Sequence, residues 1–456
     1  MRLRILCCWL ILGSLVISGC EDDPIALEIK RENLAKNYNN DVVVAYTDLY
    51  LDIERYLPGF RPASAARALA YINMASYEAA VPGMPYFVSN ASRQSGLTIP
   101  DLPEKDLKKY HWNLAINACM SKALDHFLIN KTTEQAALIK DLEASFNNQL
   151  GPNVSQEVFN NSQIWGRAVA DAIIAYAKSD LEAEAHILDP QPASYVPPSG
   201  EGKWQPENGV NALFPYWGKS RTFANHGDQL NTLPPPVYSI APGSRYYRDF
   251  AEVNRVVTQR EGQQYWMAEF WSDDIVGLSF SPPARLFAIA NQIIAIENTD
   301  LETTLHMYCK LGFAENDGAV ACWKAKYEYN VERPYQFIKA NINPDFTPIL
   351  GEAVGTPGLT PNFPGYPSGH STFGGLGAAV LAHFFGDDYY FTDRCHEGRD
   401  EFKGTPRSYS TIREFGEENA YSRIYLGVHP RFDCVEGLRL GRQIAGNVLA
   451  YELRKD

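Results

Sequence analysis

The sequence predicts an all-α fold made of two packed helical bundles. Three observations indicate this class. Apolar residues recur at helical spacing through most of the 456 residues, strand-like alternation is scarce, and stretches rich in Pro and Gly separate the helical segments. A chain of this length has room for a large core and for two subdomains.

The first 20 residues are expected to be a leader rather than part of the fold. Arg2 and Arg4 precede a short apolar run, and Val-Ile-Ser-Gly leads into Cys20. Small residues before a cysteine resemble a bacterial lipobox, in which that cysteine carries the lipid. This implies an exported protein anchored to the bacterial cell envelope, facing the periplasm or the outside. An ordinary signal peptide or a short anchor is the alternative.

Charge and cysteine content narrow the function classes. The formal net charge of -13 argues against a nucleic-acid partner. Five cysteines follow the leader and Cys20, and no C-x-x-C pair occurs among them. We therefore expect no structural zinc site, at most two disulfides, and mostly buried free thiols.

The N-terminal bundle is expected to span residues 21–186. A first helix begins within 24–56, and Pro62 and Pro82-Gly83 bound an Ala-rich helix suited to close packing. The spacing of Thr132 and Gln135 predicts a capping box. Further helices are expected over 104–130, 133–150 and 155–179.

Residues 187–243 differ in composition, being rich in Pro, Gly and aromatic side chains. A stretch this long without helical spacing either wraps or covers something, or links two halves. The sequence is compatible with a covering segment and with a linker. The C-terminal bundle is then expected over 244–456. Its predicted helices are 244–263, 282–297, 300–316, 317–340, 370–386, 412–427 and 430–453.

The C-terminal half holds three segments with chemistry-bearing residues. In KYEYNVERP, Lys326 and Arg333 are two helical turns apart, so we expect both on one helix face. Pro334 should kink or end that helix. Taken alone, two such cations are usually a solvated surface pair.

The second segment is PNFPGYPSGHSTFGG, from Pro361 to Gly375. A tight loop hands Ser368, Gly369 and His370 to the first turn of an apolar helix. Unpaired N–H groups at a helix start suit an anion. A turn with a chance histidine is the alternative.

The third segment is SRIYLGVHPRFD. Arg423 lies in a helical pattern, His429 is expected at the N-cap of a new helix, and Asp433 follows four residues later. A carboxylate in that position can fix the tautomer of an imidazole and raise its basicity. A surface pair is the alternative.

Together the three segments resemble the superfamily of type 2 phosphatidic acid phosphatases, bacterial acid phosphatases and vanadium-dependent haloperoxidases. The runs FPGYPSGHSTFGG and SRIYLGVHPRFD resemble the haloperoxidases specifically, over residues 320–445. The resemblance implies a fold like that of vanadium chloroperoxidase. It implies vanadate as cofactor, with phosphate able to occupy the same site.

The resemblance also implies roles for individual residues. His429 would bond vanadium, or carry a phosphoryl group in a phosphatase, and Asp433 would orient it. His370 would be the acid–base group. The residues expected to hold the oxyanion are Lys326, Arg333, Ser368, Gly369 and Arg423. Phe363 is the candidate halide-pocket residue, and Asp273 a candidate partner of Arg423.

The function these residues imply is oxidation of iodide, bromide or chloride by hydrogen peroxide to hypohalous acid. The alternative is a phosphomonoesterase that uses the same pocket with a phosphohistidine intermediate. A lipoprotein that binds phosphate or vanadate without turnover is a third hypothesis. The implied partners are peroxide, halide, an organic acceptor, and the membrane through the lipid anchor only. The sequence leaves a homo-oligomer open.

Overall fold

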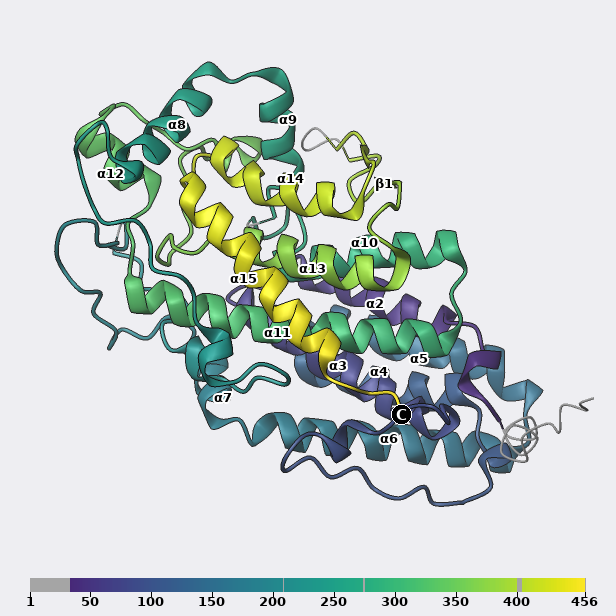
Figure 1. Cartoon of the computed structure of the whole chain (residues 1–456). Helices are drawn as coiled ribbons and strands as arrows, with labels where there is room; N and C mark the ends of the chain where they lie inside the picture. The colour runs from purple at the N-terminus through teal and green to yellow at the C-terminus, as the bar shows by residue number, and fades with distance from the viewer. Residues whose placement is uncertain (1–32, 208, 274, 400–403, 456) are drawn as a thin grey trace, which may run out of the picture. The chain divides into compact units, whose positions relative to one another are not determined.

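The computed structural model describes residues 33–207, 209–273, 275–399 and 404–455 (Figure 1). The expected leader and Cys20 lie outside these residues. All five cysteines after the leader are described and are free, four of them buried. Among the described helices, none combines the length and apolar character that a membrane crossing requires.

The described chain is mostly helical, which confirms the predicted class. The first half holds α2 (Asp41–Glu54), α3 (Ala63–Ala80), α4 (Trp112–Phe127), α5 (Thr133–Leu150), α6 (Gln156–Lys178) and α7 (Leu181–Leu188). The second half holds α8 (Arg245–Gln259), α9 (Gly262–Phe270), α10 (Pro282–Glu297), α11 (Leu301–Tyr329), α12 (Pro334–Asn341), α13 (Gly369–Phe385), α14 (Ile412–Tyr425) and α15 (Arg431–Ala450). One small antiparallel pair, β1 (Phe391–Asp393) and β2 (Arg407–Tyr409), was not expected from the sequence.

The position at which a helix begins was easier to predict than whether it runs on without a break. The capping box at Thr132 and Gln135 is present, with both reciprocal hydrogen bonds. The predicted break between residues 316 and 317 is wrong, because α11 runs unbroken for 29 residues. Gly318 does not end the helix. It makes room for Leu376 of α13, whose side chain would lie 2.4 Å from an added Cβ.

Helix α11 joins the two halves of the chain. It packs against α3 from the first half and against α13 and α15 from the second (Figure 1). Every residue of α3 is buried, and its small side chains permit this close approach. At Gly312 of α11 an added Cβ would lie 2.9 Å from the Cα of Ala70. Whether the chain divides at residues 187–243 into two bundles stays a prediction.

The Pro-rich stretch lies along the C-terminal elements. The buried carboxylate of Asp317, on α11, accepts backbone hydrogen bonds from Phe223, Ala224 and Asn225 at 2.8–2.9 Å. The Leu213 amide donates to the carbonyl of Asn362, at 2.8 Å. These contacts tie the stretch to α11 and to the loop before α13.

The contact between α13 and α15 depends on glycine. A Cβ added at Gly441 would lie 2.1 Å from the backbone oxygen of Thr372, whereas Gly446 on the same helix has open space. We expect Gly441→Ala to lower the free energy of unfolding by roughly 1–3 kcal/mol, because backbone must move. Gly446→Ala is the matched control and should raise it by up to about 1 kcal/mol. Urea unfolding of both variants measures this. Equal effects would contradict the close contact.

Candidate functional site

The structure brings the three predicted segments together. The Gly365 amide donates to the Val331 carbonyl at 2.8 Å, which joins the first segment to the second. The Ser368 amide donates to the Asp433 carbonyl at 3.0 Å, which joins the second segment to the third. The predicted side chains therefore belong to one buried cluster.

Lys326 and Arg333 meet by a different route from the one expected. Helix α11 ends at Tyr329, capped by Asn330 in a left-handed conformation with φ 51°, and Arg333 is the N-cap of α12. The two cations therefore do not share a helix face. The sequence pattern missed this because a single asparagine, rather than Pro334, terminates the helix.

Lys326 fastens the loop that precedes α13. Its buried ammonium donates to the carbonyl oxygens of Pro364, Gly365 and Pro367 at 2.7–2.9 Å. Three carbonyl dipoles thus surround one buried charge. The positive charge of Lys326 acts on the rest of the cluster through space.

Arg333 connects all three segments. Its Nε donates to the carbonyl of Phe363 at 2.9 Å, and its Nη1 donates to the carbonyl of Val428 at 3.1 Å. Nη1 also lies 3.1 Å from Nε2 of His429. The guanidinium is fully buried, so these contacts replace the water it has lost.

The contacts of His429 determine its tautomer. Arg333 can only donate, so Nε2 of His429 is the acceptor and the ring proton resides on Nδ1. Nδ1 then donates to Oδ2 of Asp433 at 2.7 Å. The other carboxylate oxygen, Oδ1, is buried and accepts no hydrogen bond from the described residues. Asp433 therefore holds a neutral imidazole with its Nε2 lone pair turned to the cations.

The surrounding charges reinforce this protonation state. Burial lowers the pKa of His429 well below its usual range, and Arg333, Lys326, Arg423 and His370 lower it further. Burial also raises the pKa of the Asp433 carboxyl to about 8, against the opposing pull of Lys326 and Arg333. Its ionised form is costly here, and the cations and the Nδ1–H offset part of that cost.

The start of α13 adds polar groups beside His429. Ser368 is the N-cap, and its hydroxyl oxygen accepts from the Ser371 amide at 3.3 Å, which leaves the O–H proton to donate elsewhere. Gly369 and His370 begin the helix and line the same small cavity as His429. On the other side, Pro430 is the N-cap of α15, so His429 lies one residue before the predicted position.

Arg423 enters from the end of α14. It is buried, lines the cavity, and its Nη1 donates to the carbonyl of Trp271 at 2.9 Å. The carboxylate of Asp273 lies 3.3 Å from Arg285 and accepts from Ser279 at 2.8 Å. Arg285 is thus one partner of the Asp273 carboxylate, and the expected pairing of Asp273 with Arg423 stays a prediction.

Two aromatic side chains cover the cations. Phe363 lies with its ring 5.0 Å from Nζ of Lys326 and 4.9 Å from the Arg333 guanidinium carbon. Trp323 packs on Phe363 with ring centroids 5.0 Å apart, and its Nε1–H is buried without a hydrogen-bond partner among the described residues. Sequence reasoning missed Trp323. Its position three residues before Lys326, on the same helix face, was the available signal.

These residues fit a tetrahedral oxyanion in charge and in donor type. Lys326, Arg333 and Arg423 bring three buried cations to the cluster. Trp323 lines the same cavity as His429, and its indole N–H has no hydrogen-bond partner among the described residues. Buried cations of this kind stabilise a bound anion by charge-assisted hydrogen bonds. The cavity has a volume of about 10 Å³, roughly room for one water molecule. Binding of a larger anion at Nε2 therefore requires Arg333 to give up its contact with that atom.

The fold and this cluster define a class of helical proteins with a buried cationic pocket between three chain segments. Comparison with known proteins agrees. A family model described as the second helical-bundle domain of VCPO matches residues 306–455. A solved bacterial vanadium-dependent iodoperoxidase is 27% identical with a TM-score of 0.79, over 93% of this chain and 99% of the other.

Two curated relatives extend the comparison. Vanadium chloroperoxidase of Curvularia inaequalis is 23% identical over 60% of this chain and 56% of its own length. Vanadium-dependent bromoperoxidase of Ascophyllum nodosum is 33% identical over 25% of this chain and 22% of its own length. The chain thus spans about half, or less, of the curated relatives it matches. A solved bacterial vanadium-dependent chloroperoxidase shares the fold, with a TM-score of 0.66 at 15% identity over 87% of this chain and 92% of the other. These comparisons make the chain a relative of the vanadium-dependent haloperoxidases in fold and in its second helical bundle.

The tautomer of His429 leads to a prediction about pH. Because burial and the neighbouring cations lower its pKa well below the usual range, the imidazole should stay neutral where a free histidine takes up its proton, near pH 6.5. NMR of protein with ¹³C-labelled histidine should show one ring signal without a titration step near pH 6.5. The His429→Gln variant assigns that signal. A midpoint near pH 6.5 for His429 would contradict the arrangement described.

Proposed function

We propose that the protein is a vanadate-dependent peroxidase that oxidises halide with hydrogen peroxide to hypohalous acid. One observation carries this proposal. The neutral His429 directs the Nε2 lone pair into a buried cluster of three cations, as a ligand for an electron-poor oxyanion centre requires. Bound vanadate would supply a Lewis-acid centre that makes peroxide reactive toward halide.

The chain's own residues would divide the remaining work. His429 would hold the oxyanion through Nε2, and Asp433 would keep its proton on Nδ1. Arg333 and Arg423 would neutralise the oxyanion charge, with Lys326 adding to the field while it holds the loop. The Ser368 hydroxyl and the Gly369 amide would donate to oxyanion oxygens.

His370 is the proposed acid–base group of the reaction. It follows Gly369 at the start of α13, is buried, and lines the same cavity as His429. It would hold the proton that peroxide loses and return it to the leaving oxygen. Phe363 and Trp323 would exclude water from the halide's approach.

Iodide is the halide we propose first. The relative that this chain matches over almost its whole length is named an iodoperoxidase, and the chloroperoxidase and bromoperoxidase relatives match more weakly or over less of the chain. Iodide is also the halide that is easiest to oxidise. The residue to substitute for a change of preference is Phe363, whose ring covers both Lys326 and Arg333.

Reconstitution with vanadate tests the proposal. Protein loaded with vanadate should form triiodide from iodide and peroxide between pH 5 and pH 8. His429→Ala should reduce this to the level of vanadate alone, since the ligand is lost. Asp433→Asn should weaken vanadate binding by roughly 10–100-fold, because the ring is no longer held by a carboxylate. Absence of oxidation with iodide, bromide and chloride alike would refute the function.

A phosphomonoesterase is the second candidate, because the same Nε2 lone pair could attack a phosphoryl group. His429 would then carry the phosphoryl group, and His370 would protonate the leaving oxygen. Steady hydrolysis of an aryl phosphate, inhibited by vanadate and lost in His429→Ala, would favour this function. Hydrolysis without halide oxidation would replace the first proposal.

We also propose that Cys20 attaches the protein to the cell envelope through a lipid. The sequence before it supports this, and it lies outside the described residues. Expressed in a bacterial host, the chain should incorporate labelled palmitate and sediment with membranes. Cys20→Ser should abolish labelling and release the protein. Labelling that persists in Cys20→Ser would refute the anchor.

A further inference from the structure

Arg285 lies in the first turn of α10, and its side chain is fully buried. Its Nη2 donates to the carboxylate of Asp393 on β1 at 2.9 Å, and its Nη1 lies 3.3 Å from the carboxylate of Asp273. Nη1 also contacts Nε2 of His396, which follows the strand. Because two buried carboxylates compensate its charge, Arg285 acts on its surroundings through its fixed geometry more than through net charge.

The same guanidinium holds the short segment between α9 and α10 that contains Trp271. Its carbon lies 4.7 Å from the ring centre of Phe270 and 4.6 Å from the ring centre of Trp271. Nη1 of Arg285 also donates to the Phe270 carbonyl at 3.4 Å. Cation–π contacts are strongest between groups removed from water, as all three are here. Together with its contact to Asp273, Arg285 therefore touches three of the four residues from 270 to 273.

The carbonyl of Trp271 links this segment to the oxyanion site. It accepts a hydrogen bond from Nη1 of Arg423 at 2.9 Å, and Arg423 lines the cavity that contains His429. The indole N–H of Trp271 donates at 3.0 Å to Glu418 on α14, the helix that carries Arg423. Trp271 is thus held at its ring by Arg285 and at its indole nitrogen by α14, which makes its carbonyl a fixed acceptor for Arg423.

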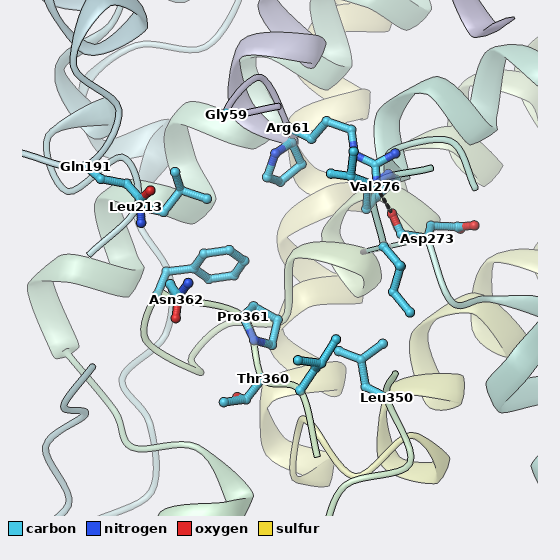
Figure 2. A pocket seen from close by; sticks show the side chains of 15 residues that line it. Gly59, Arg61, Gln191, Leu213, Asp273, Val276, Leu350, Thr360, Pro361 and Asn362 are labelled. Atoms are coloured by element: carbon cyan, nitrogen blue, oxygen red, sulfur yellow. Dashed lines mark hydrogen bonds between the residues drawn. The ribbon is translucent and has the colours of Figure 1, made fainter. Parts of the chain in front are cut away.

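The segment borders a second cavity, next to the one that contains His429. This cavity has a volume of about 360 Å³ and is lined by Asp273 and by Phe363, which lines the His429 cavity as well. Figure 2 shows Asp273 and Arg61 on the same side of it, and Nη2 of Arg61 donates to the Asp273 carbonyl at 3.4 Å. A cavity offers few packing contacts. The position of the segment therefore depends on the polar contacts that Arg61 and Arg285 make with it.

We propose that Arg285 is a positioning residue of the oxyanion site. It fixes Trp271, whose carbonyl in turn fixes the direction in which the guanidinium of Arg423 points. This rests on the proposed function, in which Arg423 neutralises the oxyanion. A guanidinium that is already fixed loses less conformational entropy when it binds an anion, so the site binds the anion more tightly. Arg285 lies outside the lining of the His429 cavity, and it therefore acts through the two intervening residues.

Vanadate binding tests this role without turnover. Arg285→Lys keeps a cation between Asp273 and Asp393 but lacks the planar guanidinium that stacks on Trp271. Titration of vanadate into the peroxide-free protein should show binding weakened by roughly 10-fold in this variant, the lower end of the usual cost of losing a supporting contact. An unchanged affinity would overturn the proposal.

Arg67→Lys is the matched control. Arg67 is also buried, pairs with Glu184 at 2.7 Å and lies 5.0 Å from the ring centre of Tyr71, but it belongs to α3 in the first half of the chain. Its replacement should leave the affinity for vanadate unchanged. Equal losses of affinity in both variants would show a general effect of removing a buried guanidinium, and would overturn the positioning role.

A double-mutant cycle asks whether Arg285 acts through Arg423. In the Arg423→Ala background, Arg285→Lys should not weaken vanadate binding further, because the residue that it positions has been removed. Losses that simply add would show that Arg285 acts by another route, and would overturn the proposal.

A variant of Trp271 tests the same route if Arg285→Lys does not fold. Trp271→Leu removes the ring on which Arg285 stacks and keeps the backbone carbonyl, so it should weaken vanadate binding several-fold. An unchanged affinity in this variant would overturn the link through Trp271.

Side-chain NMR of Arg423 separates failure of this inference from failure of the proposed function. In vanadate-free protein with ¹⁵N-labelled arginine, the Nε–H signal that disappears in Arg423→Ala should be sharp in the wild type. It should broaden in Arg285→Lys, because the guanidinium of Arg423 is no longer fixed. An unchanged signal would overturn the inference. Broadening in a protein that binds no vanadate would refute the proposed function alone and would support the positioning of Arg423 by Arg285.

Discussion

The guanidinium of Arg333 is the interaction on which the site depends. It is fully buried and donates to a carbonyl of the loop before α13, to a carbonyl of the α14–α15 turn, and to Nε2 of His429. One side chain thus fixes the spacing of three segments that are distant in sequence. It also determines the tautomer of His429, because a donor at Nε2 puts the proton on Nδ1, where Asp433 accepts it. A lysine at position 333 would keep the positive charge but would lack the planar set of donors that makes these three contacts.

Electrostatics and cavity size then follow from this arrangement. Burial and the surrounding cations lower the pKa of His429 and keep the ring neutral, and the same cations favour an anion near Nε2. The anion and Arg333 compete for the same lone pair, so binding would exchange one charge-assisted contact for another. The aromatic cover of Phe363 and Trp323 leaves a cavity of about 10 Å³ beside a second one of about 360 Å³.

The fold class and the residues of the cluster could be predicted because both depend on short stretches of neighbouring residues. Caps such as Thr132, and motifs such as Pro-Ser-Gly-His, need only a few neighbouring residues to be recognised. Features that depend on packing were missed. The predicted break between residues 316 and 317 does not occur, and Gly318 makes room there for Leu376. Asn330, rather than Pro334, ends α11 through its left-handed backbone. Asp273 pairs with Arg285, and Trp323 packs on Phe363 and lies near Lys326. The first two contacts join residues distant in sequence, so they could not be predicted before the packing of the helices was known.

The central claim is that His429 and the three cations form one oxyanion site whose ligand atom is Nε2. A crystal structure of the protein grown with orthovanadate tests this most directly. We expect a single oxyanion bonded to Nε2 of His429, with Arg333 moved from that atom to an oxyanion oxygen and Asp433 still accepting from Nδ1. A structure in which Arg333 keeps its contact with Nε2, and vanadate lies elsewhere or is absent at saturating concentration, would contradict it.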